Sequence, residues 1–308
     1  MKKSITIFCL SFLFAGIILP AGIIYLGNLL NFKISRRLDI ERVTKIPIIA
    51  EISHSDVKNT LLVVERPRSI AAEQIRALRT NMQFLIPDEN PKVILVTSSI
   101  SGEGKSFVSL NLGASLAMSG KKVVILEMDL RKPKLHIGLD INNKLGISNY
   151  LIGKVNYKDI IKPIPLQENY YVITSGTAPP NPAELLVKGP VSKLIEELKQ
   201  DFDYIILDTP PVGLVTDAQI LGAYADLTLF IVRHNYTAKS QIQNIDNLYR
   251  NKKFNNLNII MNSIDMGDAY GYSYGYGYGY GYGGGGYYQE EENTKPSRLK
   301  KLVRRNNK

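Results

Sequence analysis

The segment Thr97–Phe107 (TSSISGEGKSF) contains the residue types of a phosphate-binding loop. It follows a strand-like apolar run and precedes a segment with helical periodicity, which is the context that such a loop requires. Glycines allow backbone N–H groups to wrap around phosphate oxygens, and the helix N-terminus adds partial positive charge. The usual pattern begins with a glycine, whereas this chain has Ser99 there. A tight turn with an incidental lysine is the alternative, but the letters GEGKS in this context favour phosphate binding.

Within this loop, Lys105 can reach the β- and γ-phosphates of a nucleotide, and the hydroxyl of Ser106 can ligate Mg²⁺. No G-x-G-x-x-G motif follows a strand-like segment, which argues against a dinucleotide fold of the Rossmann type. We therefore expect ATP and Mg²⁺ as cofactors. The expected nucleotide contacts are Ser101, Gly102, Glu103, Gly104, Lys105, Ser106 and Phe107.

Two other strand-like segments end in acidic residues. The run Tyr204–Pro211 (YIILDTPP) ends at Asp208, and Val123–Arg131 (VVILEMDLR) carries Glu127 and Asp129. The carboxyl ends of parallel strands meet at one edge of a sheet, where a phosphate-binding loop also sits. An acid at this edge can hold Mg²⁺ directly or through water. These carboxylates are therefore candidates for the same site.

The stretch 92–263 alternates short apolar runs with amphipathic segments. Strands that alternate with helices imply a parallel sheet covered by helices on both faces. The predicted fold class is α/β, with a P-loop NTPase-type sheet. The expected strands are Lys92–Thr97, Val123–Met128, Tyr170–Thr174, Tyr204–Asp208, Leu227–Val232 and Leu257–Met261. The expected helices are Ser69–Phe84, Lys105–Met118, Pro182–Lys199, Asp217–Ala223 and Ala238–Arg250.

The chain of 308 residues has a formal net charge of +10, and its N-terminal part is apolar from Ile5 to Leu30. About 20 apolar residues span a bilayer, so this run predicts one transmembrane helix. A signal peptide is the alternative, but the run exceeds a usual apolar core and no Ala-x-Ala-like cleavage site follows. The positive-inside rule places the rest of the chain in the cytoplasm. The basic residues behind this orientation, which can also contact anionic lipid, are Lys33, Arg36, Arg37, Arg42 and Lys45.

The other end of the chain, Ala269–Tyr288, is almost entirely tyrosine and glycine. Glycine at alternate positions costs backbone entropy and offers no packing, so we expect a disordered tail. Cys9 is the single cysteine, which excludes a disulfide framework. The expected division is a transmembrane anchor (1–32), a juxtamembrane segment with an oligomerisation helix (33–90), a P-loop ATP-binding domain (91–265) and the Tyr-rich tail (266–308).

Together these features resemble the bacterial tyrosine kinases that partner capsule and exopolysaccharide export. The similarity covers nearly the whole chain. It rests on the apolar N-terminal run, the ExxRxxR pattern of Glu73, Arg76 and Arg79, the loop Ser98–Ser106, the acidic segment Glu127–Arg131, Asn181–Leu186 (NPAELL), Leu207–Pro211 (LDTPP) and the terminal tyrosines.

The resemblance implies roles for individual site residues. Lys105 and Ser106 would bind phosphate and Mg²⁺, and Asp129 and Asp208 would act around the metal with Ser106. The catalytic group would be Lys105, Glu127, Asp129 and Asp208. The family usually has aspartate at the position of Glu127. The longer side chain leaves open whether Glu127 lies near the metal or acts as base for an incoming tyrosine hydroxyl.

The resemblance further implies an enzyme that autophosphorylates its C-terminal tyrosines within a homo-oligomeric ring. The tail is long enough to reach its own site or a neighbour's, and a ring favours transfer in trans because the neighbour's tail has a high effective concentration there. Glu73, Arg76 and Arg79 would form the contact between neighbouring subunits. The helix could equally present an ordinary solvated charged face. The expected phospho-acceptors are Tyr270, Tyr272, Tyr274, Tyr276, Tyr278, Tyr280, Tyr282, Tyr287 and Tyr288.

The expected location is the bacterial inner membrane, with the catalytic domain in the cytoplasm. Expected partners are the polysaccharide-export machinery and a separately encoded transmembrane adaptor, unless the chain is a fragment of a longer protein; no nucleic-acid partner is expected. One alternative is a regulatory ATPase of the partitioning and septum-placement type, which carries a lysine early in its loop, where this chain has Ile100. The other alternative is an ATP-gated assembly scaffold without significant kinase activity.

Overall fold

The computed structural model describes residues 31–55, 60–86, 91–187 and 189–265, together with the isolated positions 16, 18, 20 and 22. The predicted anchor (1–32) lies almost wholly outside these residues, and the predicted tail (266–308), with its candidate phospho-acceptors, lies wholly outside them. Within the described part of the chain, no helix has the length and apolar character needed to cross a bilayer.

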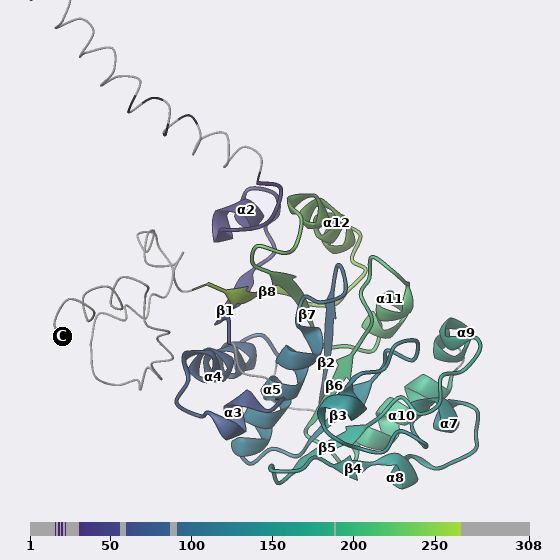
Figure 1. Cartoon of the computed structure of the whole chain (residues 1–308). Helices are drawn as coiled ribbons and strands as arrows, with labels where there is room; N and C mark the ends of the chain where they lie inside the picture. Colours follow the sequence, from purple (N-terminus) through teal and green to yellow (C-terminus); the bar gives the residue numbers. More distant parts are fainter. Residues whose placement is uncertain are drawn as a thin grey trace, which may run out of the picture.

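The described chain forms one sheet of eight strands in the order β1-β8-β7-β2-β6-β3-β5-β4 (Figure 1). Neighbouring strands are parallel except at one edge, where β4 pairs antiparallel with β5. The predicted parallel α/β sheet is thereby confirmed. The strands are β1 (Ile48–Ser53), β2 (Lys92–Ser98), β3 (Val123–Glu127), β4 (Lys162–Pro163), β5 (Tyr170–Ile173), β6 (Tyr204–Asp208), β7 (Leu227–Arg233) and β8 (Leu257–Ile264).

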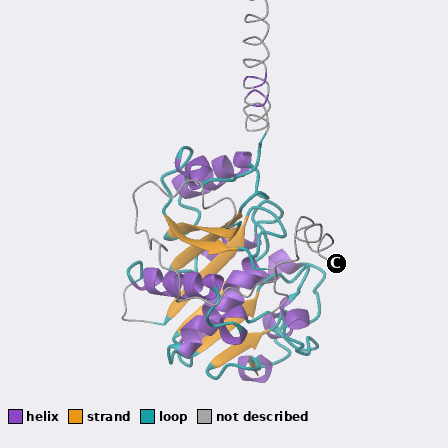
Figure 2. Ribbon diagram, turned by 60° about the vertical axis from the view of Figure 1, so that its left-hand side comes forward, coloured by secondary structure: helices purple, strands orange, loops and turns teal. Residues whose placement is uncertain are grey.

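Helices cover both faces of this sheet, as the sequence predicts (Figure 2). In Figure 1, α3, α4 and α5 lie to the left of the sheet, and α9, α10 and α11 lie to its right. The longer helices are α4 (Ile70–Gln83), α5 (Lys105–Met118), α10 (Pro190–Lys199) and α12 (Lys239–Arg250). The shorter ones are α2 (Arg37–Glu41), α3 (Leu62–Glu65), α6 (Leu135–Gly138), α7 (Ile147–Leu151), α8 (Tyr157–Ile160), α9 (Pro182–Val187) and α11 (Asp217–Gly222).

The central strands are buried on both faces because their side chains alternate between two apolar cores. In β2, Val93 and Leu95 pack into one core, and Ile94 and Val96 pack into the other. Since successive side chains of a strand point to opposite faces, a strand between two helical layers must be apolar throughout. This is why the run KVILVT could be identified from its composition alone.

The helix predicted over Pro182–Lys199 is two helices, so that prediction is wrong in detail. α9 ends at Val187, and α10 begins at Pro190 after Gly189. Proline fits the first turn of a helix but has no N–H group to continue one, so Pro190 marks a new start. α4 begins where expected, with the hydroxyl of Ser69 accepting a hydrogen bond from the Ala72 N–H at its N-terminus.

Candidate active site

The phosphate-binding loop connects β2 to α5 at the edge where the central parallel strands end. Gly104 is the residue before α5, and its φ of +95° lies in the left-handed region. A Cβ atom at this position would overlap with the side-chain nitrogen of Asn262, at the end of β8. Both the backbone conformation and the available space therefore require glycine here.

The side chain of Glu103 points into the protein and stabilises the loop through hydrogen bonds, so it does not face a ligand. Its side chain is fully buried, accepts a hydrogen bond from the Ile100 N–H at 2.8 Å, and accepts another from the Thr237 hydroxyl. Burial raises the pKa of this carboxyl above its usual value, and these hydrogen bonds partly oppose that rise. The part of Glu103 available for a phosphate is its backbone N–H group.

The carbonyl groups of the loop are held by side chains from the last two strands and the turn after β7. Arg233 donates to the Gly102 carbonyl at 2.8 Å, and Asn262 donates to the Glu103 carbonyl at 2.9 Å. The hydroxyl of Tyr236 donates to the Ser101 carbonyl at 2.9 Å. Within the described part of the chain, the N–H groups of residues 102–104 have no hydrogen-bond acceptor of their own. Unpaired N–H groups in a loop at a helix N-terminus are what an anionic phosphate binds.

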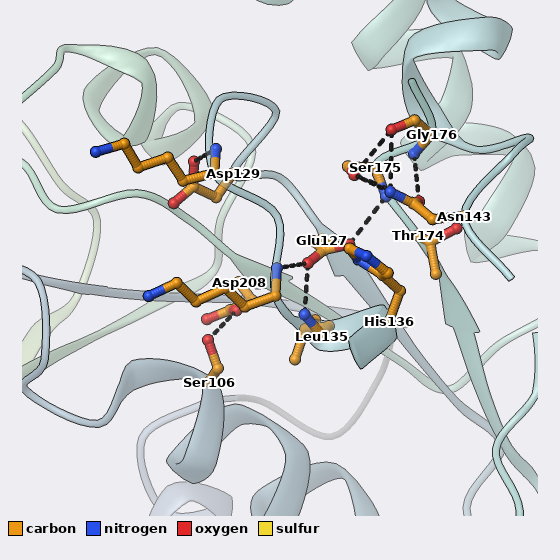
Figure 3. A network of polar contacts seen from close by, with 12 residues as sticks. Ser106, Glu127, Asp129, Leu135, His136, Asn143, Thr174, Ser175, Gly176 and Asp208 are labelled. Atoms are coloured by element: carbon orange, nitrogen blue, oxygen red, sulfur yellow. Dashed lines mark hydrogen bonds and ion pairs between the residues drawn. The ribbon is translucent and has the colours of Figure 1, made fainter. Parts of the chain in front are cut away.

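A hydroxyl and a carboxylate meet directly beside this loop. The Ser106 hydroxyl donates to Asp208 Oδ2 at 2.7 Å, and the Ser109 hydroxyl donates to Asp208 Oδ1 at 3.1 Å. Figure 3 shows Ser106 and Asp208 facing each other. Serine and carboxylate oxygens are ligands that Mg²⁺ accepts alongside phosphate and water. These side chains therefore fit a divalent metal held between the loop and the end of β6.

Burial sets the protonation of the charged groups in this site. It raises the pKa of Asp208 to about 6, although hydrogen bonds from Ser106 and Ser109 and the charge of Lys105 oppose this. Burial also lowers the pKa of Lys105, while the charges of Asp208 and other nearby carboxylates oppose that change. The Lys105 ammonium donates to the Ser98 hydroxyl, at the end of β2, at 3.2 Å.

Glu127, at the end of β3, lies next to Asp208 in the sheet, but its carboxylate is occupied elsewhere. It accepts hydrogen bonds from the backbone N–H groups of Lys134 at 2.5 Å, Leu135 at 2.6 Å and Ser175 at 3.2 Å. The side chain is 1% exposed, and Figure 3 shows these contacts converging on it. Glu127 thus connects the segment after β3 to the segment after β5.

Asp129 is the more accessible acid of the same segment. Its Oδ1 atom accepts from the backbone N–H groups of Arg131 at 3.3 Å and Lys132 at 3.0 Å, which closes a tight turn. Arg131 in turn pairs with the fully buried Asp217 at 3.3 Å, at the start of α11. Among the described residues, the other carboxylate oxygen of Asp129 accepts no hydrogen bond, so it is free to contact a ligand or metal.

Comparison with known proteins places the chain in a family. The family model described as AAA domain matches residues 91–261. A putative tyrosine-protein kinase of Staphylococcus aureus, CapB, is 34% identical over 212 residues, which cover 68% of this chain and 92% of that protein. The kinase domain of the Escherichia coli tyrosine kinase ETK superposes with a TM-score of 0.70 at 29% identity, over 80% of this chain and 100% of that domain. The chain belongs to the bacterial tyrosine-protein kinases.

A longer relative matches this chain over only part of its own length. The putative tyrosine-protein kinase in the cps region of Klebsiella pneumoniae is 32% identical over 280 residues, which are 85% of this kinase but 38% of that protein. The resemblance drawn from the sequence is thus confirmed, as is protein-tyrosine kinase activity as the enzyme class. The P-loop fold further implies nucleotide binding with a divalent metal.

The three residues of the ExxRxxR pattern lie on α4, and each contacts its own chain. Arg76 pairs with Glu73 at 2.5 Å and donates to the Pro67 carbonyl at 2.6 Å. Arg79 donates to the Ser115 carbonyl at 2.6 Å and so connects α4 to α5. All three side chains are partly exposed. Their predicted role between subunits remains a proposal.

Several side chains that shape the site of this kinase were not singled out from the sequence: Arg233, Tyr236, Thr237 and Asn262. They act on the backbone of the loop, and their contacts span more than a hundred positions of sequence. For Asn262 a signal did exist, because it is a polar residue near the carboxyl end of an apolar strand. The rule that identified Asp208 could have identified it.

Proposed function

We propose that this kinase transfers the γ-phosphate of MgATP to tyrosines of its own C-terminal cluster, Tyr270–Tyr288. The observation that carries the proposal is the pairing of Ser106 with Asp208 at 2.7 Å beside a loop with unpaired N–H groups. This arrangement supports a metal-bound triphosphate, and the tyrosine-rich tail supplies acceptors on the same chain.

In this proposal each group has one task. Mg²⁺ held by Ser106 and Asp208 would neutralise charge on the β- and γ-phosphates. The N–H groups of residues 102–104 bind phosphate oxygens, and Lys105 offsets the charge that develops during transfer. Asp129, whose second carboxylate oxygen accepts no hydrogen bond from the described residues, would act beside the metal or accept the proton of the tyrosine hydroxyl.

We further propose that transfer occurs in trans within a ring of identical subunits. β8 is parallel to β7, so the chain leaves β8 at the edge that carries the phosphate-binding loop. A neighbouring subunit would present its tail there at high effective concentration. Glu73, Arg76 and Arg79, partly exposed on α4, are our candidates for the subunit contact. Each phosphate adds about −1.5 to −2 charges, so a phosphorylated tail would loosen the ring.

The cellular role that we propose is regulation of capsular or exopolysaccharide synthesis or export at the bacterial inner membrane. The apolar run Ile5–Leu30 would anchor the kinase there in a single pass, with the catalytic domain in the cytoplasm. Partners would be the export machinery and a transmembrane adaptor. This role rests on the apolar run and on the family to which the chain belongs.

The test is to incubate the full chain, in detergent or nanodiscs, with MgATP and to map phosphate by mass spectrometry. We expect several phosphotyrosines between residues 270 and 288 that are absent in Lys105→Met. Lys154→Met, at an exposed lysine outside the loop, is the matched control and should leave the pattern unchanged. If ATP binds but no phosphotyrosine forms, even with an adaptor segment supplied, the chain acts as an ATP-gated scaffold instead.

A further inference from the structure

The segment after β3 brings a second lysine to the carboxyl edge of the sheet. Lys134 immediately precedes α6, and its backbone N–H is held at 2.5 Å by the carboxylate of Glu127. Glu127 is the register neighbour of Asp208, which is hydrogen-bonded to Ser106 in the phosphate-binding loop. A short chain of contacts therefore fixes the backbone of Lys134 beside the proposed metal and phosphate site.

The charge of Lys134 has no carboxylate partner among the residues that the structure describes. Its side chain is exposed and, in the described part of the molecule, has neither an ion pair nor a hydrogen bond. Its positive charge also acts on the partly buried Lys105, where it adds to the lowering of the Lys105 pKa that burial chiefly causes. Two ammonium groups that repel each other at one site favour a polyanion between them.

We propose that Lys134 is a second phosphate-binding lysine of this kinase and that Glu127 is the positioning residue that holds it in place. The inference rests on the proposed nucleotide site and names a further residue of it. The early position of the loop is Ile100, which carries no charge and whose N–H is bound by Glu103. The second cation therefore comes from a different element, the connection between β3 and α6.

The contacts of Glu127 favour positioning over proton transfer. Its carboxylate accepts three backbone N–H groups and is 1% exposed, so turning toward a substrate hydroxyl would leave those donors unpaired. A buried donor without a partner costs the full desolvation free energy of its N–H group. Glutamate is one methylene longer than the aspartate usual at this position, which extends the reach of its carboxylate toward Lys134 and Ser175. The glutamate in this chain is thus matched to the loop that it holds.

The first test measures binding of ATP and ADP to the full chain by calorimetry in the presence of Mg²⁺. Lys134→Met should weaken ATP binding about tenfold, as the loss of one charged hydrogen bond predicts. Lys134→Arg should retain most of the affinity. Lys154→Met is the control, an exposed lysine in another segment, and should bind ATP normally. Normal ATP binding by Lys134→Met, with its melting temperature unchanged, would overturn the proposal.

The second test separates positioning from catalysis at Glu127. Lys134 and Leu135 both donate to Oε1, so the carbonyl of a glutamine could keep these two bonds. We expect Glu127→Gln to bind ATP within about threefold of wild type and to keep measurable phosphotransfer. Glu127→Ala should weaken ATP binding as Lys134→Met does. Because both changes remove the same contact, the variant that combines Glu127→Ala with Lys134→Met should bind ATP no more weakly than either single variant.

A general base at position 127 would behave differently. Glu127→Gln would then lower kcat about 10²–10⁴-fold, leave KM unchanged and remove the acidic limb from the pH profile of the residual activity, and this result would overturn the assignment. If Glu127→Ala does not fold, the glutamine variant still decides between the two roles. Because calorimetry needs no turnover, its outcome is independent of whether the tail tyrosines are phosphorylated.

Discussion

At the scale of single residues, Asp208 illustrates a conflict between stability and metal binding. Its buried carboxyl has a pKa of about 6, against an ordinary value of 3.8. The folded protein therefore binds the proton more tightly than the unfolded chain, and stability falls as pH rises from about 4 through 6. At higher pH the ionised group costs about 3 kcal/mol, which corresponds to a shift of about two pKa units.

Replacing this carboxyl should stabilise the protein while inactivating it. We expect Asp208→Asn, without nucleotide or metal, to melt at a higher temperature than wild type at pH 8. The difference should shrink as pH falls through 6 toward 4, because the wild-type carboxyl then becomes protonated in the folded state and its buried charge is removed. Mg²⁺-dependent ATP binding should be lost. Thermal unfolding at several pH values checks this expectation, and equal pH dependence of the two proteins would contradict it.

The residues of the site were predictable to different degrees. Lys105, Ser106 and Asp208 could be placed together because strand ends and a helix start of one parallel sheet share an edge. The sequence could not predict that the Glu127 carboxylate is used up by backbone hydrogen bonds. Its partners at Lys134 and Ser175 come from segments with no periodic pattern of their own. A sequence pattern can therefore predict where a strand ends. Whether the side chain at that end is available to a ligand depends on contacts with distant segments.

At the scale of elements, the turn from loop to helix at Gly104 depends on both backbone conformation and space. Gly104→Ala would place a Cβ on top of the Asn262 side-chain nitrogen at a φ of +95°. We expect a loss of stability greater than the roughly 1–2 kcal/mol of the left-handed conformation alone, and loss of ATP binding. Denaturant unfolding and nucleotide titration measure the two effects.

The chain offers a matched control for this prediction. Gly120 has a φ of +84°, and no atom lies within 4 Å of the place that a Cβ would take, so Gly120→Ala should show the conformational cost alone. Adding Asn262→Ala to Gly104→Ala removes the close contact but not the strain, and should restore part of the stability. Equal losses in Gly104→Ala and Gly120→Ala would contradict the role of Asn262.

The helices and strands also differed in how well they could be predicted from the sequence. α5 was predicted with its bounds Lys105–Met118 because a loop motif marks its start. β4, with only Lys162 and Pro163, is too short for any periodicity and exists through pairing with β5. Short elements of this kind are products of tertiary structure rather than of local sequence preference.

At the scale of the whole molecule, the segment before residue 91 is built into the same sheet as the phosphate-binding loop. β1 pairs in parallel with β8, with Ile48 opposite Ile259, across more than 200 positions of sequence. The matched family model begins at residue 91 and leaves this strand out. The pairing was not predictable, because strand composition does not reveal which distant strand will be the neighbour.

Removing residues before 91 should therefore destroy the fold rather than trim it. The loss would uncover the β8 edge and take away the buried side chains of Ile52, Leu62, Ile75, Leu78 and Met82. At about 2 kcal/mol for each, their burial contributes on the order of 10 kcal/mol, comparable to the stability of a whole domain.

We expect residues 91–265 alone to aggregate or to melt without cooperativity, whereas residues 31–265 unfold in one transition. Residues 46–265, which lose α2 but keep β1 and α4, should still fold with reduced stability. Cooperative melting of the 91–265 chain close to the temperature of the longer one would instead show that residues 33–90 are a separable unit, as the division drawn from the sequence assumes.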